Sequence, residues 1–404
     1  MLKKQLEKYL TENEEIYLAL NSIAINITHA SRKENFIDCI CNYLEEELAE
    51  ELLDNLVNDN LLKNSIQYEC DEEFNSAILL QETCEYCENK IEDHEYYLLY
   101  EVEFLEVLRE YNLELLKRYF SSDSQVVICD LRENMHKVIP FVGAGISKSL
   151  GFPLWKDLFL FAREGIPDEY IAVFDKRYRD GNIDKLIECI LEFHPLIQNE
   201  KDLKSKIIKP QVNKKLTALD INCSILPDLL NLDTEYILTT NYDHALEQCN
   251  QQIEAGYDIS RNVINFEGFE NLEDQKYVFH LHGDVDMLDS MIVTNKDYIE
   301  LYSKEDNKRI LTGLISKYSM LFLGFSMNDQ YFSQELKSIS DSNRGYGTNY
   351  MVLINSNASI EKNILDSNNV KFINLIAKMN DDETYEVDKQ YKFLFNFING
   401  NILD

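Results

Sequence analysis

From residue 136 onward, short apolar runs rich in β-branched and aromatic residues alternate with longer stretches of helical periodicity. The runs read KVIPFV, TEYILTT, KYVFHL, SMLFLGF, YMVLI and VKFINLI. Strands that alternate with helices are typical of a parallel sheet with helices packed on both faces. We therefore predict that residues 135–404 fold as an α/β domain around a doubly wound parallel sheet.

The first four of these runs end in polar or glycine-rich residues. The segments that follow them read GAGIS, NYDHALE, HGDVD and GFSMND. Parallel strands bring their carboxyl ends to one edge of the sheet, and open α/β sheets bind their ligands at that edge. We therefore expect these four loops to meet at one site.

Two of the seven histidines, His280 and His282, stand one residue apart at the end of the third run. Residues two apart in a strand point to the same face, so both rings would lie on one side of the sheet where it ends. In isolation the pair fits either of two interpretations. The rings could be hydrogen-bonded core histidines, or one of them could be a catalytic group.

The glycine loop GAGIS follows an apolar strand and precedes a helix. Glycine lets the backbone turn tightly and lets a phosphate approach the amides, and the start of a helix offers unpaired N–H groups. The run GAGISK lacks the third glycine of the dinucleotide fingerprint found in dehydrogenases. The loop therefore favours phosphate binding but disfavours a hydride-transfer enzyme.

Taken together and in this order, GAGIS, TTNYD, HG and GFS resemble the catalytic core of the sirtuins over about residues 136–375. The resemblance is specifically to the sirtuin-like, NAD-cleaving effectors of prokaryotic antiviral defence. The resemblance implies a Rossmann-type sheet and NAD as the substrate. It also implies a role for each matching residue: catalytic for Asn241, Asp243 and His282, and cofactor-binding for Gly143, Ala144, Gly145, Ser147, Gly324 and Ser326.

Two departures from the sirtuin pattern bear on the reaction. Deacylating sirtuins follow HG with cysteine pairs that bind a structural zinc, whereas no cysteine follows Cys249 here. The segment GFPLW at residues 151–155 replaces the sirtuin segment that supplies an arginine. Both changes favour hydrolysis of NAD to nicotinamide and ADP-ribose. The alternatives are a protein deacylase or ADP-ribosyltransferase, and a non-catalytic nucleotide-binding sensor.

The chemistry of that bond assigns a task to each candidate. Cleaving the nicotinamide–ribose bond builds positive charge on the ribose, so the site must hold the diphosphate and place a nucleophile at the anomeric carbon. His282 suits general base catalysis, and Asn241 can position water or the ribose. His280 is expected to be a neutral, hydrogen-bonded neighbour. Asp243 fits a ribose contact and a helix cap equally well.

Residues 1–134 contain neither glycine nor proline and carry apolar residues at helical spacing. They predict an acidic α-helical domain, with 31 acidic against 11 basic residues. We expect this domain to mediate homo-oligomerisation or partner docking, and we expect the chain to form a homo-oligomer. The alternative is that the domain only packs on the second domain. The chain has no GxxxxGK[ST] loop, and the family resemblance suggests a separate HerA-like ATPase as one candidate activator.

The overall composition narrows the class further. A net charge of −33 disfavours direct binding of nucleic acid. No apolar run approaches eighteen residues and the N-terminus lacks a signal pattern, so we expect a cytoplasmic protein that does not enter a membrane.

The nine cysteines are scattered and odd in number, which predicts reduced thiols. Cys84 and Cys87 have the spacing of a zinc-binding pair, with Cys70 upstream and His94 downstream. Structural zinc sites normally combine two close pairs of ligands, and only one pair is present. The sequence therefore predicts no metal.

Overall fold

In the computed structural model, the chain divides into two compact units. Unit 1 comprises Met1–Tyr119 together with Asn396–Asp404, and unit 2 comprises Phe120–Phe395. The structure describes residues 2–70, 73–78, 83–260, 275–303, 313, 316–325, 348–356, 370–380 and 385–404. No helix in this described part of the chain is both long and apolar enough to span a bilayer.

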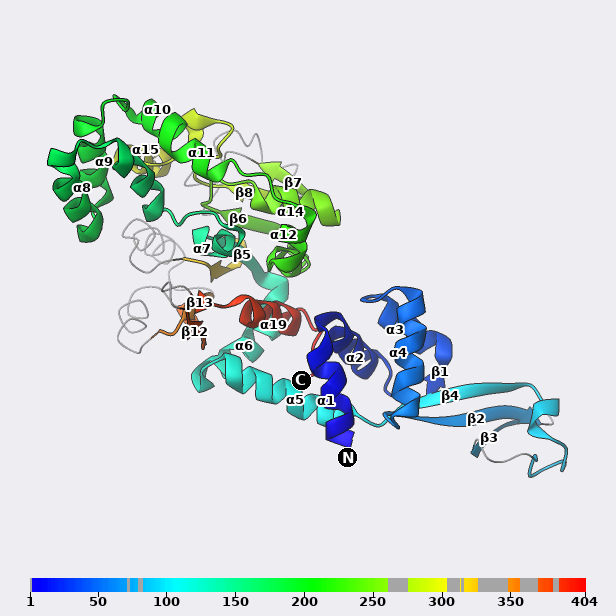
Figure 1. The fold of residues 1–404 in the computed structure, drawn as a ribbon. Helices are drawn as coiled ribbons and strands as arrows, with labels where there is room; N and C mark the ends of the chain where they lie inside the picture. Colours follow the sequence, from blue (N-terminus) through cyan, green and yellow to red (C-terminus); the bar gives the residue numbers. More distant parts are fainter. Residues whose placement is uncertain are drawn as a thin grey trace. The chain divides into compact units, whose positions relative to one another are not determined.

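Unit 1 contains four helices near the N-terminus and a fifth that ends its first stretch at Tyr119 (Figure 1). They are α1 (Leu2–Glu12), α2 (Glu14–Asn26), α3 (Lys33–Cys41), α4 (Glu46–Asn58) and α5 (Leu105–Tyr119). Helix α4 shows why these segments are helical, because its buried residues Ala49, Leu52, Leu53 and Leu56 recur every three to four positions. Glu46 and Glu47 lie in its first turn, where negative charge complements the helix dipole.

Unit 1 also contains an antiparallel sheet, so the prediction of a purely helical domain is wrong in this part. The strands β1 (Ser31–Arg32), β2 (Leu62–Cys70), β3 (Glu73–Ile78) and β4 (Tyr96–Val102) lie in the order β1-β4-β2-β3. The sequence predicts a helix over the β4 segment as well, because its apolar residues also fit helical spacing. Its tyrosines favour a strand, and pairing with β2 decides the outcome.

The last residues of the chain complete unit 1. The Asn112 side chain on α5 donates to the carbonyl of Leu403 at 2.8 Å, and the backbone N–H of Leu403 donates to the Asn21 side chain at 3.0 Å. Both asparagines are buried. These bonds satisfy polar groups that would otherwise be costly inside a core.

Unit 2 contains a seven-stranded parallel sheet, which confirms the predicted doubly wound α/β fold. The sheet order is β11-β10-β9-β5-β6-β8-β7. The bounds are β5 (Val138–Val142), β6 (Tyr236–Thr239), β7 (Tyr257–Ser260), β8 (Lys276–His280), β9 (Ser319–Leu323), β10 (Asn349–Ile354) and β11 (Val370–Leu375). All six predicted strands are present. The short edge strand β7 was not predicted from the sequence.

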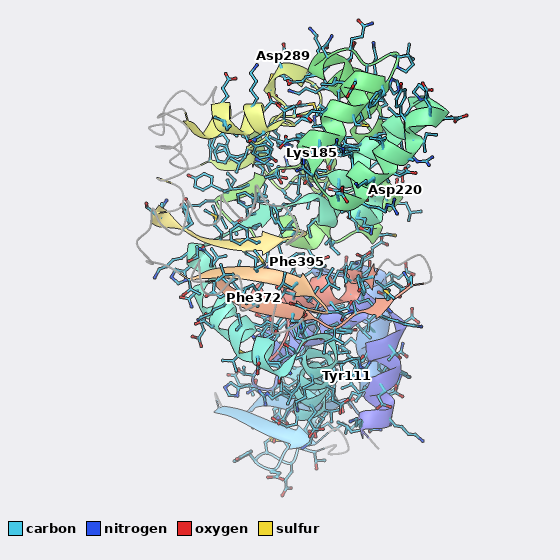
Figure 2. All side chains as sticks on the ribbon, turned by 90° about the vertical axis from the view of Figure 1, so that its left-hand side faces the viewer. Tyr111, Lys185, Asp220, Asp289, Phe372 and Phe395 are labelled. Atoms are coloured by element: carbon cyan, nitrogen blue, oxygen red, sulfur yellow. The ribbon has the colours of Figure 1, made fainter. Side chains whose placement is uncertain are left out.

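A buried apolar cluster surrounds the central strands of the sheet. In it the Phe141 ring of β5 contacts the Phe322 ring of β9 at 5.3 Å between centroids, with the ring planes tilted by 55°. Phe372 of β11, labelled in Figure 2, belongs to the same cluster. Helix α6 (Ser122–Asn134) lies in unit 2, where Asp130 accepts hydrogen bonds from Tyr350 and Lys371 at 2.7 Å each. The predicted boundary at residue 134 places this helix in the first domain instead.

Between β5 and β6 the chain forms a group of helices beside the sheet (Figure 1). The group has its own buried cluster, which includes Phe159, Phe174 and Ile190. Its elements are η4 (Lys156–Gly165), α8 (Asp168–Asp180), α9 (Ile183–Phe193), α10 (Glu200–Asp202), η5 (Leu203–Ile208) and α11 (Lys209–Val212).

Unit 2 also contains four short helices, η2 (Met135–Lys137), α7 (Ala144–Ser147), η3 (Lys148–Leu150) and η8 (Leu288–Ser290), and several further elements. After η5 and α11 come α12 (Ala218–Cys223) and α13 (Leu226–Leu230), and α14 (Ala245–Ile253) follows β6. Helix α15 (Asn295–Ser303) follows β8, the short strands β12 (Lys378–Met379) and β13 (Tyr385–Glu386) pair antiparallel, and α19 (Asp388–Ile398) ends the fold.

Candidate active site

The four strands whose carboxyl ends were expected to meet are neighbours in the sheet, in the order β9-β5-β6-β8. Their following loops border a cavity of about 520 Å³. The other wall of the cavity comes from the helical group, through residues of η4, α8 and α11. The prediction that these strand ends converge is therefore confirmed by the structure, and the cavity lies where an open α/β sheet binds its ligands.

The glycine loop and Gly324 pack directly against each other. Backbone N–H groups of Gly143 and Gly145 donate to Leu323 and Gly324 carbonyls at 2.8 and 2.9 Å. A Cβ on Gly145 would lie 2.7 Å from the Gly324 oxygen, and a Cβ on Gly324 would lie 2.5 Å from the Ile146 nitrogen. No side chain fits at either position.

The glycine-loop residues do not all reach the cavity. Gly143, Ala144 and Gly324 line it, whereas Gly145 and Ser147 lie behind the lining. Ser326, the remaining residue of the predicted set, lies outside the described residues. Gly143 and Gly324 thus border the cavity and also pack closely, whereas Gly145 serves close packing outside the lining.

Asn241, Ser147 and Asp243 form one hydrogen-bonded group. The Asn241 amide Nδ2 donates to Ser147 Oγ at 3.2 Å, and Ser147 Oγ donates to Asp243 Oδ1 at 3.3 Å. Asn241 Oδ1 is buried and has no hydrogen-bond partner among the described residues, and Asn241 lines the cavity. A buried acceptor of this kind is costly unless a ligand or water donates to it.

Asp243 also caps the chain before α14, because its Oδ1 accepts a hydrogen bond from the Ala245 N–H at 3.0 Å. Its side chain is buried, and burial raises the pKa of Asp243 to about 6 despite that hydrogen bond. Both interpretations left open for Asp243 therefore find support in the geometry, because it braces the loop and lines the cavity.

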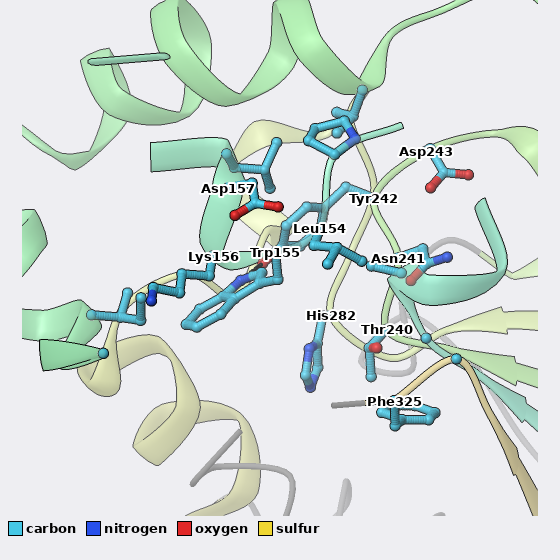
Figure 3. Close-up of a pocket in the computed structure, with 18 of the residues that line it drawn as sticks. Leu154, Trp155, Lys156, Asp157, Thr240, Asn241, Tyr242, Asp243, His282 and Phe325 are labelled. Atoms are coloured by element: carbon cyan, nitrogen blue, oxygen red, sulfur yellow. Dashed lines mark hydrogen bonds between the residues drawn. The ribbon is translucent and has the colours of Figure 1, made fainter. Parts of the chain in front are cut away.

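His282 lines the cavity beside Asn241 and Thr240 (Figure 3). Its ring makes an edge-on contact with Tyr298 at 5.1 Å between centroids. Burial lowers the pKa of His282 to about 3, so the imidazole is neutral at pH 7. The next residue, Gly283, adopts a φ of +75°, and a Cβ there would lie 2.3 Å from the Ser290 carbonyl oxygen. Only glycine fits this turn.

His280 lies outside the cavity lining and is completely buried. Its Nδ1 lies 2.9 Å from the Asn241 carbonyl oxygen, and its Nε2 lies 2.6 Å from Glu247 Oε1. Burial acts to lower the pKa of His280, but the Glu247 carboxylate outweighs it and the net direction is upward. The structure thus places His280 as a neighbour that orients the Asn241 loop. The sequence predicts a neutral ring here, whereas the contact with Glu247 favours the protonated form.

His244, Asp284 and Asp286 form a second polar cluster next to the site, with His244 Nε2 at 3.7 Å from an oxygen of each carboxylate. Asp284 is completely buried, and its Oδ1 accepts the N–H of Asp286 at 2.6 Å. This bond holds the turn after Gly283. The cluster has donors that a cation could use, but the turn already accounts for its geometry.

The sequence missed several residues that line the cavity. The helical group contributes the cations Lys156 and Arg179, and the aromatic wall includes Trp155, Tyr298 and Phe325. Figure 3 shows Trp155 near His282, and its Nε1 donates to the Tyr242 hydroxyl at 3.3 Å. Trp155, the single tryptophan, could have been singled out from the sequence. Lys156 and Arg179 could not, because they belong to no recognisable motif.

Comparison with known proteins agrees with this geometry. Residues 235–373 match the family model of the SIR2-like domain, a range that starts after the glycine loop. A protein named NAD(+) hydrolase ThsA from Enterococcus faecium is 26% identical over 222 residues, which cover 54% of this chain and 43% of the relative. A protein of the same name from Cytobacillus dafuensis is 26% identical over 216 residues, covering 52% of this chain and 40% of the relative. The matches thus span less than half the length of either relative.

Proposed function

Because residues 235–373 match the SIR2-like domain, we propose that this chain hydrolyses NAD at the bond between nicotinamide and ribose. The products are nicotinamide and ADP-ribose. The observation that carries the proposal is the joint placement of Asn241 and His282 on the wall of one cavity, with a glycine loop beside them. The names of the two relatives support hydrolysis over protein deacylation, ADP-ribosyl transfer to a protein, or a silent sensor.

The cavity suits a dinucleotide in size, and its wall opposite the strand ends carries two cations beside the carboxylates of Asp157 and Asp180. Its volume of about 520 Å³ lies in the range of small-molecule sites. Lys156 and Arg179 offer two positive charges on the wall opposite the strand ends, and these charges can pair with a diphosphate. Gly143 and Gly324 let the ligand approach the backbone closely. In this proposal the diphosphate lies between the glycine loop and the two cations.

In the reaction, the glycosidic C–N bond breaks and the oxygen of water attacks the anomeric carbon. His282 accepts the proton that the water loses, because its ring is neutral at pH 7. A base of such low pKa is weak, and the negative charges of the bound diphosphate raise its proton affinity. The unpartnered Oδ1 of Asn241 accepts a hydrogen bond from the water or from a ribose hydroxyl.

Asp243 and Ser147 act as positioning residues in this scheme. They fix the amide of Asn241 through the Ser147 hydroxyl, so that Oδ1 and not Nδ2 remains for the ligand. Asp243 is ionised in most molecules at pH 7, because its pKa of about 6 lies below that pH. Its negative charge near the ribose also stabilises the positive charge of the transition state.

The direct test is to incubate the purified full chain with NAD and to separate the products by chromatography. We expect equal amounts of nicotinamide and ADP-ribose, with no requirement for a protein or peptide substrate. Nicotinamide release that depends on an acylated peptide, with transfer of the acyl group, would instead identify a deacylase. Binding of NAD without any cleavage, measured by calorimetry over the same period, would favour the sensor.

We further propose that the activity serves antiviral defence by depleting cytoplasmic NAD, and that unit 1 restrains or triggers it. Residues 1–119, the longer stretch of unit 1, carry 28 acidic and 10 basic residues. Like charges repel, so this charge opposes self-association and favours a basic partner surface, such as one on a HerA-like ATPase. Light scattering at increasing salt concentrations distinguishes a homo-oligomer from a complex with a basic partner. Added salt strengthens homo-oligomers of acidic units but weakens a complex with a basic partner.

A further inference from the structure

Four metal-ligating side chains that are distant in sequence meet at one end of the unit 1 sheet. They are Cys70 at the end of β2, Cys84 and Cys87 in the turn that follows β3, and His94 just before β4. One ligand atom from each, three sulfurs and a ring nitrogen, lie within 4.8 Å of one another. A zinc ion with sulfur ligands at 2.3 Å places its tetrahedral corners about 3.8 Å apart, so the observed set encloses the volume that such an ion needs.

The pairing of β2 with β4 brings the first and last of these residues together. Tyr68 of β2 lies opposite Tyr96 of β4, and the backbone N–H of Glu69 donates to the Glu95 carbonyl at 3.0 Å. In an antiparallel pair, moving two residues forward on one strand matches two residues back on the other. This register sets Cys70 opposite His94.

The turn that carries Cys84 and Cys87 is tightly closed on itself. The N–H of Cys84 donates to the Asn89 carbonyl at 2.7 Å, and the N–H of Glu88 donates to the Cys84 carbonyl at 3.1 Å. Glu88 has a φ of +60°, a left-handed conformation that a glutamate adopts only at a cost. The N–H of Tyr86 points to Cys84 Sγ at 3.4 Å, which favours a thiolate at that position.

His94 is oriented as a metal-binding histidine would be. Its Nδ1 lies 2.9 Å from the Lys90 carbonyl oxygen, so Nδ1 carries the proton and donates it. The lone pair is then on Nε2, which points to Cys87 Sγ at 3.2 Å. A backbone carbonyl that fixes the tautomer of a ligating ring is the usual arrangement around protein-bound zinc.

The surrounding apolar packing is small. The buried members are Tyr68, Cys70, Cys84 and Ile91, and the Tyr68 ring meets the His94 ring edge-on at 5.5 Å between centroids. Two of these four residues are themselves ligand candidates. A cluster of this size stabilises a strained turn only weakly, and a bound metal would supply the missing cross-links.

We propose that Cys70, Cys84, Cys87 and His94 bind one Zn²⁺ as a structural site that holds the end of the unit 1 sheet. Three thiolates and one imidazole are a ligand set that zinc prefers over magnesium or calcium. All four positions are filled by protein, so the ion serves structure and has no open position for substrate. The sequence predicts no metal in this chain, and the present proposal replaces that prediction.

Metal analysis of the full chain without a histidine tag tests the proposal. After anaerobic purification with a reductant and zinc, we expect one zinc per chain. Cys84→Ser and His94→Ala should each lose the zinc, whereas Cys41→Ser, at an exposed cysteine of the same unit, should keep it. Reconstitution of wild-type chain with Co²⁺ should give the charge-transfer absorption of tetrahedral thiolate ligation, which reports on the site even if a variant folds poorly.

Thiol labelling gives an independent readout. The three site cysteines should resist labelling in the zinc-loaded chain and react after a chelator is added. Wild-type protein without zinc after reconstitution would overturn the proposal, as would zinc that survives both site substitutions. Stoichiometric iron in place of zinc, or a Cys84–Cys87 disulfide in reduced protein, would also overturn it.

Discussion

The cavity of unit 2 and the thiol cluster of unit 1 are both small polar sites, but they are supported in opposite ways. The cavity residues stand on strand ends that emerge from a cluster of thirteen buried apolar residues. The buried packing at the thiol cluster consists of four residues, two of which are the ligand candidates Cys70 and Cys84. The large core fixes the cavity in the absence of ligand, whereas the thiol cluster depends on what it binds. We therefore expect changes at the cavity to alter activity, and changes at the cluster to alter stability.

The largest expected effect is a loss of NAD cleavage without a loss of stability. His282→Ala and Asn241→Ala should each reduce NAD cleavage by about 10²-fold or more, because each removes a group that acts on the reacting bond. Their unfolding temperatures should stay close to wild type, since both side chains line a cavity. His29→Ala, at an exposed histidine of unit 1, is the control. If either cavity variant keeps a tenth of the activity, the site is assigned wrongly.

Removing zinc from the thiol cluster should give the opposite pattern. A chelator should split thermal unfolding into two transitions and lower the earlier one by roughly 10 °C, because a structural metal contributes several kcal/mol to its unit. Initial rates of NAD cleavage below that transition should change less than about twofold, since the ion lies outside the reacting atoms. Calorimetry and rate measurements on the same sample check both. A single thermal transition at an unchanged temperature would contradict a stabilising role for zinc at the thiol cluster.

Gly145→Ala tests whether packing holds the cavity in place. The new Cβ would meet the Gly324 oxygen at 2.7 Å, so the glycine loop and the β9 end must separate. We expect a loss of about 1–3 kcal/mol in the free energy of unfolding, together with reduced activity. Gly256→Ala is the matched control, because a Cβ there meets nothing within 4 Å and only its φ of +80° is unfavourable. Denaturant unfolding of both variants provides the comparison, and an equal loss in the two would exclude a packing role for Gly145.

Lys156→Ala and Arg179→Ala test the proposed position of the bound diphosphate. Each should raise KM about tenfold and change kcat little, because the cations bind substrate and transition state alike. Lys176→Ala, on the same helix as Arg179 but outside the cavity lining, should leave both constants unchanged. A fall in kcat at constant KM would instead place the cations at the reacting bond.

The smallest effect concerns pH. The folded pKa of His282 is about 3 and its ordinary value is 6.5, so between these values the unfolded chain binds a proton that the folded chain does not. Wild-type protein should therefore lose stability relative to His282→Gln as pH falls below 6.5, by up to about 1.4 kcal/mol per pH unit. Asp243 titrates in both proteins, so its contribution to the pH dependence of stability largely cancels in the difference between them. Denaturant unfolding at pH 7 and pH 5.5 checks the difference, and parallel curves would mean that His282 is protonated when folded.

The two sites also differ in how far the sequence predicted them. The cavity could be predicted because apolar runs identify buried strands, and parallel strands place their carboxyl ends at one edge. The approach of Cys70 to His94 depends on the pairing of β2 with β4, and helical spacing concealed both strands. Lys156 and Arg179 come from a helical group whose packing against the sheet edge no local pattern encodes.

Unit 1 is built from two separate stretches of chain, Met1–Tyr119 and Asn396–Asp404, with unit 2 inserted between them. A proteolytic nick between Tyr119 and Phe120 would therefore release neither unit, because the longer fragment still carries the nine residues that complete unit 1. The other connection runs inside helix α19, whose hydrogen-bonded backbone resists proteases. The chain can therefore be divided between Tyr119 and Phe120. We expect residues 1–119 and residues 120–404, expressed as two separate chains, to reassemble into the folded protein.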